Sequence, residues 1–100
     1  MLESIYEEAL CVELQRRCIH FERQLVIPLI YKGEPLQQSF RLDFLVESKI
    51  VLELKAVSSL EKIHEAQLLT YLKIAHFQLG LLINFNVPVL KDGIKRLRNG

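Results

Sequence analysis

The chain has 100 residues, of which half are apolar and a quarter are charged, and its formal net charge is +1. This composition is typical of a folded domain and excludes a disordered tail, while the near-neutral charge excludes nucleic-acid binding through the overall field of the molecule. No apolar run reaches the ~20 residues that a membrane-spanning helix needs, and the acidic, amphipathic start is unlike a secretion signal. We therefore expect a cytoplasmic protein that binds no membrane.

The first third of the chain predicts a helix followed by a strand. Apolar residues at helical spacing over residues 2–17 predict the helix. Residues 22–31, rich in Leu, Val and Ile, predict the strand, and the Gly and Pro within 32–35 predict a turn after it. Pro28 removes a backbone N–H from this strand, so we expect it to be an edge strand or to carry a bulge.

The middle of the chain predicts a hairpin. Side chains alternate over residues 40–46, and a second apolar run covers 50–57. If residues 47–49 form a three-residue loop, Val46 pairs with Ile50 and the two strands lie antiparallel.

The remaining third predicts a helix, a strand and a basic tail. Ser58 and Glu61 have the spacing of a capping box, and the helix that follows should end near His76. The nearly continuous apolar run over 78–85 predicts a buried strand that returns parallel to the sheet. Residues 91–98 predict a short basic helix. The fold class is therefore α/β.

The predicted hairpin brings three charged side chains together. With a three-residue loop, Asp43 falls opposite Glu53, and opposed Cβ atoms in an antiparallel pair are ~4.5–5.5 Å apart. Two like charges at that separation repel unless a cation lies between them, and Mg²⁺ prefers such oxygen ligands. Lys55, two residues along the same face, would point its ammonium at the same place. A two-residue loop would instead put Asp43 and Glu53 on opposite faces.

The spacing of Asp43 and the tripeptide Glu53, Leu54, Lys55 resembles the D-x(n)-ExK core of the PD-(D/E)XK nucleases. Within that superfamily the chain is similar to the small prokaryotic GxxExxY proteins, through LESIYEEAL, FRLDFLVESKIVLELKAV, HEAQLLTYLK and GLLINFNVPVLKDGIKR. The resemblance implies a restriction-endonuclease-like αβββαβ core, in which helices flank a mixed central sheet.

The resemblance also implies further site residues. A glutamate of the first helix commonly joins the metal site, and Glu7 is preferred over Glu3 because it lies beside apolar residues of the helix. Gln67 and Tyr71 match the QxxxY pattern of the RecB-like branch and share one face of the second helix. They could support the metal or touch DNA, or equally Tyr71 could pack in the core while Gln67 bonds the backbone.

The sequence departs from the family pattern at two places. The family's opening Gly would fall before Met1, and an upstream helix is usual, so we expect residues 1–100 to form a single nuclease-like domain that lacks an N-terminal helix. The uncovered apolar surface could favour a homodimer. Leu42 also stands where the motif often has Pro, a variation that the superfamily tolerates.

The resemblance implies a nuclease that uses Mg²⁺ or Mn²⁺ to hydrolyse phosphodiester bonds of DNA. The alternative is a catalytically inactive, nuclease-derived module for nucleic-acid binding or protein assembly, because a fold alone does not determine function. Scattered basic residues could contact phosphate or only solubilise the surface; they are Arg16, Arg17, Arg23, Lys91, Lys95, Arg96 and Arg98. The cysteines and histidines lack disulfide or zinc-ligand spacing and are interpreted as structural; they are Cys11, Cys18, His20, His64 and His76.

Overall fold

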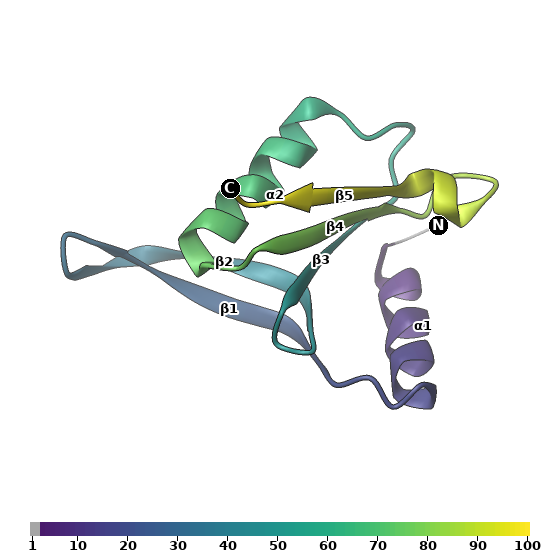
Figure 1. Ribbon diagram of the computed structural model, residues 1–100, viewed down its shortest axis with the longest axis horizontal. Coiled ribbons are helices and arrows are strands. Elements are labelled where there is room, and N and C mark those ends of the chain that lie inside the picture. The colour runs from purple at the N-terminus through teal and green to yellow at the C-terminus, as the bar shows by residue number, and fades with distance from the viewer. Residues whose placement is uncertain (1–2) are drawn as a thin grey trace.

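The computed structural model describes residues 3–100 and contains two α-helices, one 3₁₀ turn and five strands. In chain order they are α1 (Glu3–Arg16), β1 (Phe21–Tyr31), β2 (Glu34–Val46), β3 (Ile50–Lys55), α2 (Lys62–Ala75), β4 (Leu79–Asn84), η1 (Leu90–Gly93) and β5 (Ile94–Arg98). The predicted αβββαβ order is confirmed (Figure 1), although Leu2, where the first helix was expected to begin, lies outside the described residues. Within this part of the chain no helix is long and apolar enough to span a membrane.

The five strands form one mixed sheet in the order β1-β2-β3-β4-β5. The first three strands are antiparallel, β4 runs parallel to β3, and β5 returns antiparallel to β4. Val46 pairs with Ile50, so the turn between β2 and β3 has the three-residue length that the sequence predicted. The parallel return of β4 after α2 is likewise confirmed.

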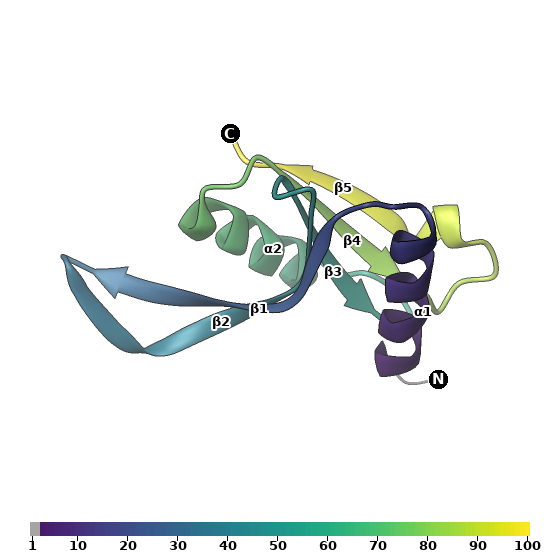
Figure 2. The same cartoon turned by 90° about the horizontal axis from the view of Figure 1, so that it is seen from below.

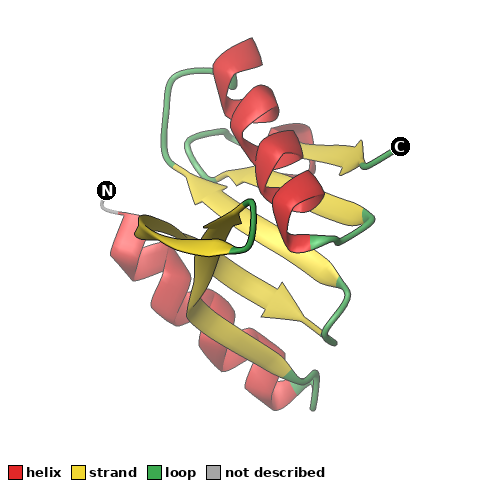
Figure 3. Cartoon of the chain, turned by 90° about the vertical axis from the view of Figure 1, so that its left-hand side faces the viewer, coloured by secondary structure: helices red, strands yellow, loops and turns green. Residues whose placement is uncertain are grey.

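The two helices cover opposite faces of the sheet (Figure 3). Strand alternation supplies each face with its own apolar cluster, because neighbouring residues of β3 point to opposite sides. The cluster under α1 contains Cys11, Leu14, Phe44, Val46, Leu52, Leu54 and Ile83. The cluster under α2 contains Leu42, Leu45, Val51, Leu68, Leu72, Leu82 and Leu97.

β1 and β2 form a long hairpin that extends well beyond the helices (Figure 2). β2 begins at Glu34, six residues earlier than the predicted strand, because the alternating run continues the pairing with β1 to the turn. The expectation for Pro28 is confirmed, since β1 is an edge strand and its register shifts between Pro28 and Ile30.

The start of α2 differs from the prediction. The helix begins at Lys62 with Glu61 as its N-cap, so the capping box expected at Ser58 is wrong. His64 takes the position in which a capping box usually has Glu or Gln, and its Nδ1 accepts a hydrogen bond of 2.9 Å from the Glu61 backbone N–H. The His64 imidazole thus accepts from the N–H of the N-cap residue Glu61. In the predicted box, the Glu61 carboxylate would have accepted from the N–H of Ser58.

The basic tail is a strand, and the predicted helix over residues 91–98 is wrong. After the short turn η1, β5 pairs with β4 and buries Leu97 against the cluster under α2. A helix of this length is unstable alone, whereas the open edge of β4 offers backbone partners to an extended chain. Asn99 completes the junction, because its amide donates to the backbone oxygens of Leu72 and Phe77.

Replacement of Gly93 by alanine should destabilise the fold by about 2 kcal/mol or more. A methyl group at this buried position would overlap the backbone oxygen of Asn84 and touch Val87. Urea unfolding measures the change. As a control, Gly33→Ala should cost only about 1 kcal/mol, because Gly33 has open space around it and only its left-handed φ of 81° opposes a side chain. Equal losses for the two variants would contradict the steric explanation.

Candidate functional site

The side chains of β2 change face at Asp43. Phe44 and Val46 pack in the cluster under α1, whereas Leu42 and Phe40 pack with the cluster under α2. Regular alternation would have kept all four on one side of the sheet. Asp43 therefore lies at the point where the strand switches from one core to the other.

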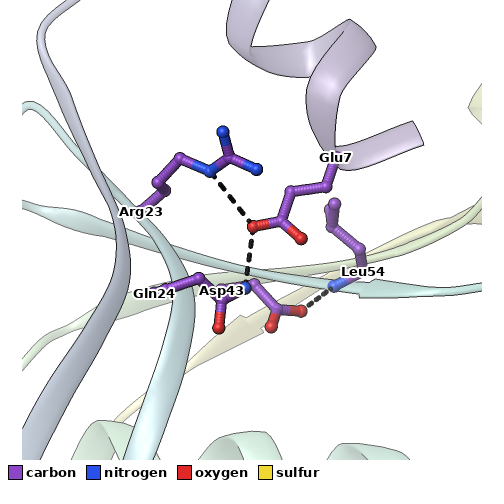
Figure 4. Close-up of polar contacts among 5 residues, drawn as sticks. All are labelled: Glu7, Arg23, Gln24, Asp43 and Leu54. Atoms are coloured by element: carbon purple, nitrogen blue, oxygen red, sulfur yellow. Dashed lines mark hydrogen bonds and ion pairs between the residues drawn. The ribbon is translucent and has the colours of Figure 1, made fainter. Parts of the chain in front are cut away.

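At the same point β2 separates from β3. The paired register ends at Phe44 and Leu52, and its continuation places Asp43 across from Glu53. The next backbone donor of β3, the N–H of Leu54, has no strand partner on this side and donates instead to Asp43 Oδ2 at 2.8 Å (Figure 4). The aspartate carboxylate thus replaces a ladder hydrogen bond and is fixed against β3 by it.

Glu53 is a buried carboxyl group without a hydrogen-bond partner for one of its oxygens. Its exposed fraction is 7%, and its Oε1 is buried and unpaired within residues 3–100. Burial, followed by the charge of Asp43, raises the pKa of Glu53 to about 9, and the ammonium of Lys55 opposes this only partly. A buried carboxyl group with one unpaired oxygen, beside a second carboxyl group, offers the oxygen ligands of a divalent-cation site.

Lys55 ends β3 beside a buried asparagine. The residue pairs in parallel register with Asn84, which is only 2% exposed. The Asn84 side chain accepts from the backbone N–H of Val57 and donates to its carbonyl, while the Phe85 N–H donates to the Lys55 carbonyl. These bonds fix the backbone at Lys55 and at Val57, two residues further along the chain. Asn84 was missed in the sequence, although an amide that ends an apolar run beside the ExK strand is a recognisable signal.

The second helix, α2, brings Gln67 and Tyr71 to the face of the sheet toward which Glu53 and Lys55 point. Gln67 Nε2 donates to the Tyr71 hydroxyl oxygen at 2.8 Å, and the Tyr71 ring stacks on Phe40 with centroids 4.3 Å apart. Burial raises the pKa of Tyr71, and the charges of Glu53 and Asp43 add to this effect. Gln67 therefore bonds the tyrosine and not the backbone, while Tyr71 packs on Phe40 and lies close enough to Glu53 and Asp43 for their charges to act on it.

Glu7 projects from α1 toward the region where the strands separate (Figure 4). Its Oε1 accepts hydrogen bonds from Gln24 Nε2 at 2.7 Å and from Arg23 Nε at 3.3 Å. The helix itself is anchored by Tyr6, whose ring stacks on Phe85 with centroids 4.4 Å apart.

The structure does not bring every proposed ligand into one cluster. In the described part of the chain no three Asp, Glu, His or Cys side chains gather into a group that could hold a metal ion. Asp43 and Glu53 come together, and Glu7 is connected to them through the neighbouring strand β1. Glu3 lies exposed in the first turn of α1.

An apolar hollow of about 550 Å³ lies at the other end of β3, far along the strand from Lys55. It lies between the β2–β3 turn and the start of β4 and contains none of the proposed site residues; its lining is Ser48, Lys49, Ile50, His76, Phe77, Gln78 and Leu79. Both cysteines are free, as the sequence predicted. Cys11 is buried in the cluster under α1 and is structural, whereas Cys18 is exposed, so the structural interpretation is wrong for Cys18.

Comparison with known proteins gives a family for this arrangement. The model of a family described as the PD-(D/E)XK nuclease superfamily matches residues 1–97. Among solved structures, the one titled "Crystal structure of SSO0001" is similar, with a TM-score of 0.63 at 21% sequence identity. That similarity covers 98% of this chain and 50% of the other, so the chain spans about half the length of the solved relative. The search of curated proteins found no match.

Without metal, the protein should lose stability as the pH rises. Below 4.5 the Glu53 carboxyl is protonated in both the folded and the unfolded chain, and between 4.5 and about 9 only the folded chain keeps the proton. The free energy of unfolding should therefore fall by up to about 1.4 kcal/mol per pH unit across this window. Urea unfolding in the presence of a chelator, at a series of pH values, measures the slope.

Glu53→Gln is the matching variant, because an amide does not titrate and should make the profile nearly flat. Glu34→Gln removes an exposed carboxyl group at the start of β2 and should leave the slope as in the wild type. An unchanged slope in Glu53→Gln would show that another group is responsible for the pH dependence.

Proposed function

Since the chain belongs to the PD-(D/E)XK nuclease superfamily, we propose that it is a Mg²⁺-dependent nuclease that hydrolyses phosphodiester bonds of DNA. Nucleases of this superfamily generally use divalent metal ions and act on nucleic acid. The observation that supports the proposal for this chain is the Glu53 carboxyl group, which is buried with an unpaired oxygen beside Asp43. A buried ionisable group with a strongly shifted pKa and a specific charged neighbour is typical of a functional site.

Asp43 and Glu53 would hold the metal ion, and Glu7 would complete the site or orient the attacking water. When bound, Mg²⁺ would favour deprotonation of that water and offset the negative charge that develops on the phosphate. Mn²⁺ has similar ligand preferences and could replace it. The Leu54 N–H already orients the Asp43 carboxylate, so the donor set requires little rearrangement.

The other residues would act on water and on the phosphate. Lys55 lies on the same face as Glu53, where its ammonium would stabilise the anionic water or the transferring phosphate. Tyr71 accepts a hydrogen bond from Gln67, which leaves its hydroxyl proton free to be donated to a carboxylate or a phosphate oxygen. The preference for DNA over RNA follows from the resemblance to RecB-like nucleases, so the assay must include both polymers.

Substitution of a proposed metal ligand should abolish cleavage without unfolding the chain. Asp43→Asn and Glu53→Gln should each lower the rate at least about 100-fold on plasmid or single-stranded DNA with Mg²⁺ or Mn²⁺, because the charge that holds the ion is lost. Lys55→Ala should lower the rate similarly but leave metal binding near the wild-type value. Calorimetric titration with Mn²⁺ separates the two effects.

Lys49→Ala is the control for the loss of a lysine, because Lys49 is exposed at the opposite end of β3. This variant should cut as the wild type does. If the wild type leaves DNA and RNA intact with either metal but shifts DNA in a gel or forms a stable assembly, the chain is a binding or assembly module and the nuclease proposal is wrong.

A further inference from the structure

Gln24 has an unusual backbone for its place in the fold. Its φ is 52°, in the left-handed region, although it lies inside the strand β1. Among residues 3–100, the other non-glycine residues with positive φ lie in turns or after helices; they are Cys18, Lys32, Glu47, Ser48 and His76. A left-handed conformation is unfavourable for a residue such as glutamine, and it persists only where the surroundings require it.

The left-handed residue switches the face of β1. Phe21 packs in the cluster under α1, and Arg23, two residues on, reaches Glu7 of the same helix. After Gln24, Leu25 and Ile27 pack with the cluster under α2. β1 therefore crosses from one core to the other at Gln24, as β2 does at Asp43.

The two switches lie directly opposite each other. Arg23 pairs with Phe44 and Leu25 pairs with Leu42, which places Gln24 across from Asp43. From this position the Gln24 amide donates to Glu7 Oε1 at 2.7 Å (Figure 4). Arg23 binds the same oxygen, so neither donor engages Oε2 of Glu7.

We propose that Gln24 is a positioning residue that holds the Glu7 carboxylate at the Asp43–Glu53 site. The inference rests on the proposed function, because Glu7 needs a fixed place only if it serves the metal ion or its water. Gln24 acts through Glu7 and does not touch the metal. Outer partners that orient a ligand typically change metal affinity by about 10- to 100-fold when they are removed.

The test separates the Gln24 amide from the Gln24 backbone. Gln24→Gly removes the amide and accepts positive φ freely, so the metal-free variant should unfold at the same or a higher temperature than the wild type. Its affinity for Mn²⁺, measured by calorimetry, should nevertheless fall about 10-fold. Gln24→Met keeps the length of the side chain without its donors and should lose affinity equally, so the test holds even if the glycine variant fails to fold.

A double-mutant cycle shows whether Gln24 acts through Glu7. Glu7→Gln should weaken Mn²⁺ binding, and adding Gln24→Gly to it should weaken binding no further, because the two residues act as one unit. Lys32→Gly is the backbone control, since Lys32 has nearly the same φ, 51°, at the tip of the hairpin. It should bind Mn²⁺ as the wild type does.

A measurement without metal completes the test. In the metal-free protein, Glu7→Gln should shift the side-chain amide resonances of Gln24 in the NMR spectrum, because a charge-assisted hydrogen bond is lost. The inference is overturned if the shift is absent, or if the wild type binds Mn²⁺ and both Gln24 variants bind it equally well. If the wild type binds no Mn²⁺ at all, the proposed function fails and the inference fails with it.

Discussion

The burial of an incompletely bonded carboxyl group, Glu53, is the constraint on which the rest of the structure depends. Removing such a group from water is unfavourable, and the fold compensates only in part, since burial and the charge of Asp43 raise the pKa of Glu53 to about 9. A sheet built only for stability would have an apolar side chain at this place, as it has at Val51 and Leu54. Three elements meet around Glu53: β2 separates from β3 there, Tyr71 of α2 lies close enough for the Glu53 charge to act on it, and Asn84 of β4 pairs with Lys55 at the end of β3.

Two opposed requirements meet at the site. β1 and β2 pack on α1 near the β2–β3 turn and on α2 farther from that turn. Their side chains must therefore change face at some residue along each strand. The change occurs at Gln24 and Asp43, where a backbone donor of β3 is left without a strand partner and is taken by a carboxylate. The same discontinuity thus solves a packing problem and orients a charged group, which explains why polar residues at this place do not disrupt the sheet.

Sequence reasoning predicted what depends on local spacing. The length of the β2–β3 turn fixes the register that puts Asp43 across from Glu53, and i, i+4 spacing puts Gln67 beside Tyr71. It could not predict β5, because the strand exists only where the edge of β4 offers partners to a segment with helix-forming residues. It also could not predict the switch at Gln24, since glutamine, unlike glycine or asparagine, gives no signal of a left-handed backbone. Because the switch could not be predicted, the hydrogen bonds from Arg23 and Gln24 to Glu7 could not be predicted either.

The register shift between Pro28 and Ile30 divides the hairpin into an inner part, tied to the site, and an outer tip. An irregularity at this position can absorb insertions or deletions in the loop end, because pairing nearer to Gln24 does not depend on how the distal residues align. A change in the length or surface chemistry of the tip therefore need not disturb the pairing of β1 with β2 around Asp43. The outer tip of the hairpin can thus acquire a new binding surface without any change in the Asp43–Glu53 site at its base.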